Sequence, residues 1–182
     1  MFALDLTFIY AIKLAIALVF IVGAIQKLKD IDTFQATVEA YDLLPQFLVT
    51  GFSIALPVVE LVTACFLFVD LSQGLYGLIL AILVLSVTTT GIIVNLLRGN
   101  LDVSCGCGGL EDEAPLSWGL VARNLIILAM LLSCFSPSDL RSLALFDTLT
   151  IIGGSLSVYF LYTVTSQLIA NHPRLVKLRE SL

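Results

Sequence analysis

Two cysteines, Cys105 and Cys107, flank a single glycine in a glycine-rich segment that lies between long apolar stretches. The thiolate is the reactive form of cysteine, both as a nucleophile and as a metal ligand. A disulfide between residues this close in sequence closes a small, strained ring, and strained disulfides are more oxidising and more labile than relaxed ones. We therefore expect Cys105 and Cys107 to form a redox pair that exchanges with a partner protein.

Two other interpretations of this cysteine pair stay open. Two thiolates suit a soft ion such as Cu(I), whereas a closed zinc site needs four ligands and the sequence holds a single histidine, His172. The two cysteines are otherwise small buried side chains, or an inert disulfide that braces the loop. We favour redox exchange, and we expect neither a metal site nor a cofactor.

Arg98 and Arg123 are candidates for stabilising a thiolate at this pair, because nearby positive charge lowers the pKa of a cysteine. Arg98 precedes the cysteine segment, and Arg123 lies about 9 Å into the next apolar stretch at ~1.5 Å per residue. A further cation and three amides fall at the same boundary: Lys27, Gln26, Asn95 and Asn124. The sequence thus predicts a ring of cationic and hydrogen-bonding side chains beneath the thiols.

Lys13 and Glu60 are charged residues inside apolar stretches, where charges are costly and often functional. Counted from the same face of a membrane at ~1.5 Å per residue, they lie about 10 and 12 Å deep. This match in depth predicts a structural ion pair between the first two membrane spans. A proton or quinone site is the alternative.

The composition excludes an ordinary soluble domain. Of 182 residues, 59% are hydrophobic and 13% are charged, whereas a soluble domain carries about 25% charged residues. A helical span needs about 20 apolar residues, and only helices or closed barrels satisfy the backbone in lipid. The net charge of −5 argues against a nucleic-acid partner, because such partners bind basic surfaces. The partner implied by composition is the lipid bilayer.

The sequence predicts an all-α integral membrane protein, made of a four-helix transmembrane bundle, a fifth candidate span and one amphipathic interfacial helix. The four spans of the bundle are expected at residues 6–25, 47–68, 75–97 and 118–135. The fifth candidate, 149–169, is diluted by glycine, serine and threonine, and a basic tail follows at 171–182. Residues 1–170 are expected to form one transmembrane domain.

The interfacial helix is expected at residues 32–44, after the first span. Apolar residues recur there at three- and four-residue steps, which is typical of a helix lying along a membrane surface. Asp32 followed by Gln35 resembles a capping box, and Pro45 ends the helix. The apolar stripe consists of Leu28, Ile31, Phe34, Val38 and Tyr41.

Charge asymmetry bears on which side the cysteines face. With five spans, six basic residues share the face of the cysteine segment: Lys27, Lys29, Arg98, Arg174, Lys177 and Arg179. The positive-inside rule then places the cysteines on the cytoplasmic side. Without the fifth crossing the tail changes sides, the count becomes three against four, and the rule decides nothing.

Several short motifs resemble the DoxX/MauE group of small membrane proteins. Residues 23–30 (GAIQKLKD) and 41–45 (YDLLP) are similar to the loop after its first span, and residues 56–61 (LPVVEL) are similar to its second span. Three further motifs resemble the MauE branch, the methylamine-utilisation accessory proteins: Arg98-Gly99, residues 105–108 (CGCG) and residues 122–125 (ARNL). The similarity covers residues 21–132 in consistent order and spacing.

This resemblance implies a multi-pass helical bundle in the bacterial inner membrane. It also implies a role in maturing the disulfide-rich small subunit of periplasmic methylamine dehydrogenase, or a similar periplasmic client, together with a thioredoxin-like partner. That role favours a periplasmic face for the cysteines, opposite to the charge count. The chain departs from the family at Gly108-Gly109, where an aromatic residue is common. The alternative function is a non-enzymatic membrane chaperone or transporter whose cysteines bind a soft metal or brace the loop.

Overall fold

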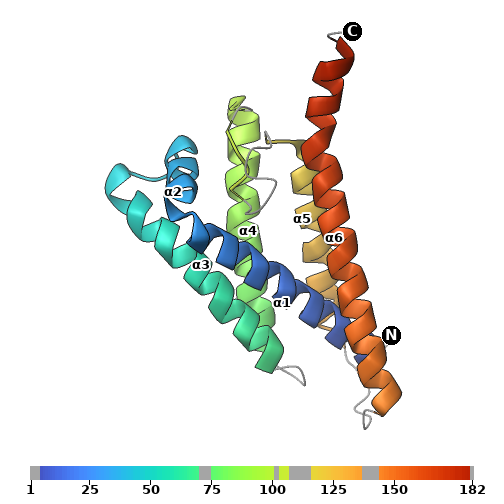
Figure 1. Cartoon of the computed structure of the whole chain (residues 1–182). Coiled ribbons are helices and arrows are strands. Elements are labelled where there is room, and N and C mark those ends of the chain that lie inside the picture. The colour runs from blue at the N-terminus through green and yellow to red at the C-terminus, as the bar shows by residue number, and fades with distance from the viewer. Residues whose placement is uncertain (1–4, 70–74, 101–102, 107–115, 137–143, 181–182) are drawn as a thin grey trace.

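The computed structural model describes residues 5–69, 75–100, 103–106, 116–136 and 144–180, with side chains up to residue 172. These residues form helices and no strands. The helices are α1 (Leu6–Lys29), α2 (Ile31–Ala40), α3 (Gln46–Val69), α4 (Leu75–Arg98), α5 (Trp118–Ser133) and α6 (Leu145–Glu180), as Figure 1 shows.

The expected all-α membrane class is confirmed. Helices α1, α3 and α4 have 24 residues each, about 36 Å, which exceeds the ~30 Å hydrocarbon core of a bilayer. Within the described residues, four helices are long and apolar enough to cross a membrane: α1, α3, α4 and the part of α6 from Leu145 to His172. The fifth candidate span is therefore part of a continuous 36-residue helix.

Helix α5 is apolar but shorter than the predicted span of residues 118–135. It has 16 residues, about 24 Å at ~1.5 Å per residue.

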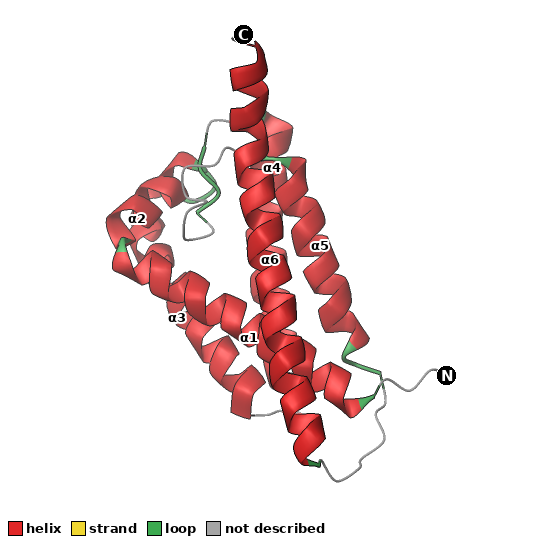
Figure 2. Ribbon diagram, turned by 45° about the vertical axis from the view of Figure 1, so that its right-hand side comes forward, coloured by secondary structure: helices red, strands yellow, loops and turns green. Residues whose placement is uncertain are grey.

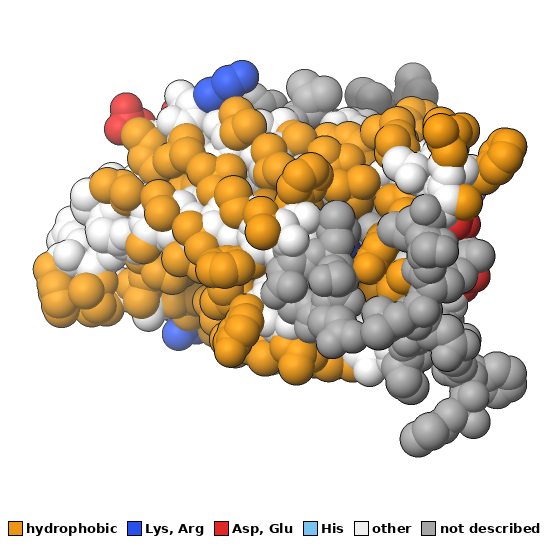
Figure 3. Space-filling model, turned by 90° about the horizontal axis from the view of Figure 1, so that it is seen from below, with side chains coloured by type: hydrophobic (Ala, Val, Ile, Leu, Met, Phe, Trp, Pro, Cys, Tyr) orange, Lys and Arg blue, Asp and Glu red, His pale blue; other side chains and the backbone are white. Residues whose placement is uncertain are grey.

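Many large apolar side chains of the other helices face outward; Phe47, Val69 and Phe146 are 81%, 82% and 81% exposed. Figure 3 shows apolar side chains spread over the face seen from below, as expected of a surface in contact with lipid.

The helices close a ring. Contacts run from α1 to α3, α3 to α4, α4 to α5, α5 to α6, and α6 back to α1, while α2 packs mainly on α3. Helix α2 and the carboxyl ends of α4 and α6 lie at one end of the molecule, and the N-terminus lies at the other (Figures 1 and 2). The cysteine segment follows α4, so it belongs to the same end as α2.

The main apolar core fills the end of the ring opposite to α2. Ile12 and Leu131 are at most 1% exposed there, between α1 and α5. Gly77 brings α4 against the backbone of α3, because a Cβ at this position would lie 2.9 Å from the amide nitrogen of Leu67. This tight packing at one end contrasts with the other end, where the helices leave space between them.

Helix α2 differs in two ways from its prediction. The N-cap is Asp30, whose carboxylate accepts a hydrogen bond from the Thr33 amide at 3.3 Å, so the predicted capping box at Asp32 and Gln35 is wrong. The helix ends at Ala40, before Asp42 takes a left-handed conformation with φ of 48°. Asp30 and Asp32 have the same side chain, and Asp30 is the cap because α1 ends at Lys29 and α2 begins at Ile31.

Candidate functional site

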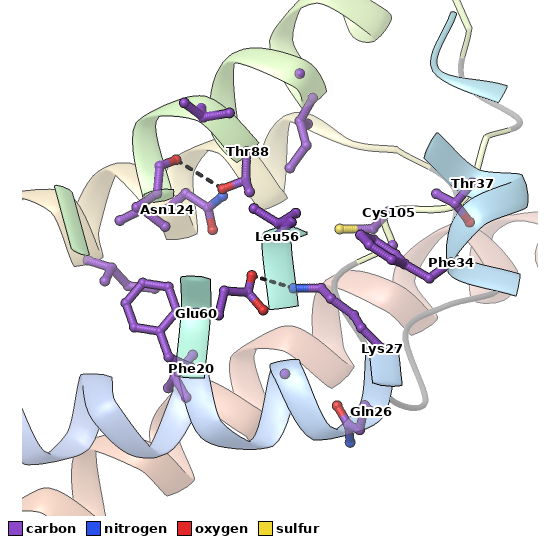
Figure 4. A pocket seen from close by; sticks show the side chains of 18 of the residues that line it. Phe20, Gln26, Lys27, Phe34, Thr37, Leu56, Glu60, Thr88, Cys105 and Asn124 are labelled. Atoms are coloured by element: carbon purple, nitrogen blue, oxygen red, sulfur yellow. Dashed lines mark hydrogen bonds and ion pairs between the residues drawn. The ribbon is translucent and has the colours of Figure 1, made fainter. Parts of the chain in front are cut away.

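One cavity of about 580 Å³ lies inside the ring and is lined by all six helices and by Cys105-Gly106. This volume is typical of small-molecule sites, which run from about 300 to 1,000 Å³. Along α1 the lining extends from Ile16 to Lys27, about 16 Å at ~1.5 Å per residue. The walls are mostly apolar, and Figure 4 shows the polar side chains Lys27, Glu60, Thr88 and Asn124 among them.

Cys105 is disulfide-bonded and buried, with 6% of its surface exposed. Figure 4 shows its sulfur pointing into the cavity on the same side as the tip of Lys27. Cys107, its predicted redox partner, lies outside the described residues. Cys65 and Cys134 are free thiols that do not line the cavity, so among the described cysteines Cys105 is the one that does.

Helix α2 holds the cysteine segment in place. The Tyr41 hydroxyl donates to the carbonyl oxygen of Cys105 at 2.9 Å, and the hydroxyls of Thr37 and Ser104 are hydrogen-bonded at 2.9 Å. Burial raises the pKa of the Tyr41 phenol, so this group stays protonated and able to donate. The predicted apolar stripe faces the cavity: Phe34 and Val38 of α2 and the C-cap residue Tyr41 line it.

Gly106 is needed for this contact. Its φ is 62°, in the left-handed region, and an added Cβ would lie 2.9 Å from the Thr37 methyl group. Glycine adopts this conformation at no steric cost, whereas other residues pay about 1–2 kcal/mol. The Cys105–Gly106 backbone can thus approach α2 more closely than any residue with a side chain would allow.

We predict that Gly106→Ala lowers the free energy of unfolding by about 2–3 kcal/mol, from backbone strain plus overpacking. Gly99→Ala is the matched control, because Gly99 also has a positive φ of 79° but no atom lies within 4 Å of its added Cβ. It should lose about 1 kcal/mol, from strain alone. Denaturant unfolding in detergent measures both, and equal losses would contradict close packing of Gly106 on α2.

Glu60 forms a buried ion pair with Lys27. The Nζ–Oε1 distance is 2.5 Å, and the two side chains are 8% and 5% exposed. Lys27 also lies 5.7 Å from the centroid of the Phe34 ring. The second carboxylate oxygen of Glu60, Oε2, is buried and has no hydrogen-bond partner among the described residues.

The predicted pair between Lys13 and Glu60 is therefore wrong. Lys13 and Lys27 are 14 residues apart, so they share a face of α1 but lie about 21 Å apart along its axis. Counting depth from one membrane face assumed that the start of α1 and the end of α3 lie at one level, and the observed register of the two helices differs. Lys13 is 3% exposed at the far end of α1, where its charge acts on Cys134.

Arg123 joins three elements of the cavity wall. It is 6% exposed, donates to the Ser166 hydroxyl of α6 at 2.6 Å, and lies 4.9 Å from the centroid of the Tyr162 ring. It also donates to the side-chain oxygen of Asn124, whose amide donates to the Thr89 hydroxyl of α4 at 3.1 Å. This network ties α5 to both of its neighbours in the ring.

The predicted ring of polar groups is only partly assembled at the cavity. Four of its members line the cavity: Gln26, Lys27, Arg123 and Asn124. Arg98 does not, and it donates instead to the backbone oxygen of Asp42 at 3.1 Å. Asn95 is fully buried but bonds to Gly91 within its own helix. A role of Arg98 at the thiols stays a prediction.

The sequence reasoning did not single out the polar face of α6. Tyr159, Tyr162 and Thr163 line the cavity, and Ser166 bonds to Arg123. Their steps of three, four and seven residues are those of one helix face, which was the signal available in a weakly apolar span. In the part of the chain that the structure describes, no three His, Cys, Asp or Glu side chains gather as a metal site.

Comparisons with known proteins place this site in a family context. The family model described as methylamine utilisation protein MauE matches residues 6–136, which include α1–α5 and the cysteine segment. A methylamine utilization protein MauE of Paracoccus versutus is 30% identical over 182 residues, 90% of each chain. That of Methylophilus methylotrophus is 30% identical over 156 residues, 82% of this chain and 80% of its own. That of Paracoccus denitrificans is 31% identical over 125 residues, 69% and 67%. No solved structure matches.

Proposed function

This chain belongs to the MauE family, and from that premise we propose that it is an accessory membrane protein of methylamine metabolism that exchanges disulfides with a client protein through Cys105 and Cys107. The observation that carries the proposal is the disulfide-bonded Cys105 facing a cavity that also holds Lys27 and Arg123. Both cations favour a thiolate at Cys105 once the disulfide opens. Arg98 is proposed to add to this field from the end of α4.

The two cysteines have different proposed roles. Cys105 is covered by α2 and is 6% exposed, so a protein thiolate cannot reach its sulfur in this conformation. We assign Cys107 to the exchange with the client and Cys105 to the departing thiolate. A client thiolate attacks the Cys107 sulfur, the bond to Cys105 breaks, and a second client thiolate then displaces Cys107. The client gains a disulfide and loses two thiol protons, and the accessory protein gains the two thiols.

The proposed client is the small subunit of methylamine dehydrogenase or a similar periplasmic protein, and the proposed location is the bacterial inner membrane. A thioredoxin-like protein is the proposed redox partner. A periplasmic client requires the cysteine segment to face the periplasm, opposite to the side given by the count of basic residues. The second function considered, a chaperone or transporter whose cysteines bind a soft metal or brace the loop, requires no exchange.

Growth of a deletion strain that expresses variants tests the role of the cysteines. Cys105→Ser and Cys107→Ser should abolish growth on methylamine and leave growth on ammonium with another carbon source unchanged. Cys65→Ser is the matched control, because Cys65 is an exposed free thiol on α3. It should grow like wild type on both media.

In the same strains, membrane immunoblots distinguish a disulfide that exchanges with a client from a disulfide that only braces the loop. Normal amounts of Cys105→Ser and Cys107→Ser protein, with no growth on methylamine, support exchange. Wild-type growth of either variant would contradict it, and so would loss of both proteins from the membrane, which is the result expected of a structural disulfide.

A further inference from the structure

Cys105 and Glu60 both line the cavity, and the proposed exchange with a client uses only Cys105. Cys105 lies beside α2, and Glu60 lies on α3 with its carboxylate at the tip of Lys27 (Figure 4). The rest of the cavity lining is largely apolar and includes Phe20, Leu56 and Ile127. A cavity of this kind between membrane helices suits an apolar molecule with a small polar head.

The buried carboxylate of Glu60 indicates that the cavity holds a ligand. It is 4% exposed, one oxygen is held by Lys27, and Oε2 has no hydrogen-bond partner among the described residues. A buried acceptor left unsatisfied costs about 1–3 kcal/mol, and more when the group is charged. A group in the cavity that donates a hydrogen bond, or a proton passed to this oxygen, removes that cost.

Lys27 supplies the complementary donor. Its ammonium carries three hydrogens, and the described hydrogen bonds use one of them, toward Glu60. An acceptor in the cavity can therefore bond to Lys27 without breaking the ion pair. The pair offers both a donor and an acceptor of protons at one point of an apolar wall.

We propose that this cavity binds a lipid-soluble quinone, which re-oxidises the Cys105–Cys107 dithiol after each exchange with a client. The inference rests on the proposed function, since it supplies the acceptor that repeated disulfide donation requires. A dithiol releases two electrons and two protons when it closes to a disulfide, and a quinone takes up two of each. A quinone also reaches a membrane-embedded cavity from the bilayer.

Re-oxidation by the quinone starts from the reduced Cys105–Cys107 pair. The Cys105 thiolate attacks a ring carbon of the quinone, and the Cys107 thiolate then attacks the Cys105 sulfur. The carbon–sulfur bond breaks, and its electron pair stays on the ring. The two protons of the thiols end on the two quinone oxygens, which makes a quinol and restores the disulfide. Glu60 relays one of these protons, and Lys27 donates a hydrogen bond to the nearer quinone oxygen.

Binding is tested with decylubiquinone and a cavity-filling variant of the full-length protein in detergent. Thr88 lines the cavity and bonds only to its own helix in the described hydrogen bonds, so Thr88→Phe places a ring inside. Thr150→Phe is the matched control, because Thr150 makes the same kind of bond on an exposed face of α6. Decylubiquinone should raise the unfolding temperature of wild type and Thr150→Phe, and Thr88→Phe should bind it at least about tenfold more weakly.

Oxidation of the dithiol by the quinone is tested by adding decylubiquinone to the pre-reduced proteins and following quinol formation. Wild type and Thr150→Phe should form quinol and recover their disulfide, whereas Cys105→Ser and Thr88→Phe should not. Lys27→Gln/Glu60→Gln, which removes both charges, should slow the step by about a hundredfold, the range of proton-transfer catalysis. Quinol formation should slow by more than the reaction of Cys105 with a small alkylating reagent, because alkylation needs the thiolate that Lys27 favours but no proton relay.

Two results would overturn the inference. One is no quinol from reduced wild type, and the other is equal quinol formation by wild type and Thr88→Phe. In either case, a mixed disulfide with a client would leave the proposed function standing, because the exchange with a client needs no quinone in the cavity. Quinol formation without any client adduct would instead retain the cavity assignment and remove the client exchange.

Discussion

Lys27→Gln should lower the free energy of unfolding by about 3–5 kcal/mol, the usual cost of leaving one member of a buried ion pair without its partner. The reason is the position of Glu60, which is 4% exposed and has no other cation among its described contacts. Lys29→Gln is the matched control, because Lys29 lies in the same last turn of α1 but is exposed. It should change stability by about 0–1 kcal/mol. Denaturant unfolding in detergent measures both.

The double variant Lys27→Gln/Glu60→Gln should recover most of the loss, because two neutral amides of similar shape replace two buried charges. Wild type, Lys27→Gln, Glu60→Gln and the double variant form a double-mutant cycle, and its coupling term should be a large fraction of the single-variant loss. Additive losses in the double variant would show that Lys27 and Glu60 do not depend on each other. In that case, the register of α1 against α3 would not rest on this pair.

The helices were predictable because each has its own local signal. Apolar runs bounded by charged or turn residues gave α1, α3 and α4 to within a few residues of their ends. The amphipathic stripe gave α2, with Tyr41 correctly placed on its apolar face. The fifth candidate span was harder, since its serines, threonines and tyrosines dilute the apolar signal. They do so because one face of α6 lines a cavity and holds Arg123.

The pairing of charges was not predictable in the same way. Lys13 and Lys27 are equally good partners for Glu60 by residue type and by helix face, and the axial register between α1 and α3 decides between them. That register depends on how α2 and the ring of helices pack, which is a property of the whole fold. The same holds for Arg98, which sequence proximity placed at the thiols and the structure places on the Asp42 carbonyl oxygen.

The central claim of this account is that the cysteine segment exchanges disulfides with a client at Cys107 while Cys105 stays buried. The described cysteine of the pair is buried: the Tyr41 hydroxyl donates to the carbonyl oxygen of Cys105, and only 6% of Cys105 is exposed. A variant without Cys105 cannot form the internal disulfide, so its Cys107 thiolate reacts in the reverse direction, with a disulfide already present in the client. No Cys105 thiol is then present to release the client, so the mixed disulfide should persist. A variant without Cys107 keeps only the buried thiol.

The most direct measurement is therefore acid trapping of mixed disulfides in cells grown on ammonium with another carbon source and then exposed to methylamine, because the two variants are not expected to grow on methylamine. Both variants are made in a Cys65→Ser background, so that the exposed thiol of α3 cannot contribute adducts. After alkylation, non-reducing gels and mass spectrometry identify any attached protein and hence the side of the membrane. The account predicts a reducible adduct with a periplasmic protein in Cys105→Ser and none in Cys107→Ser. No adduct in either variant, or the same adduct in both, would contradict it.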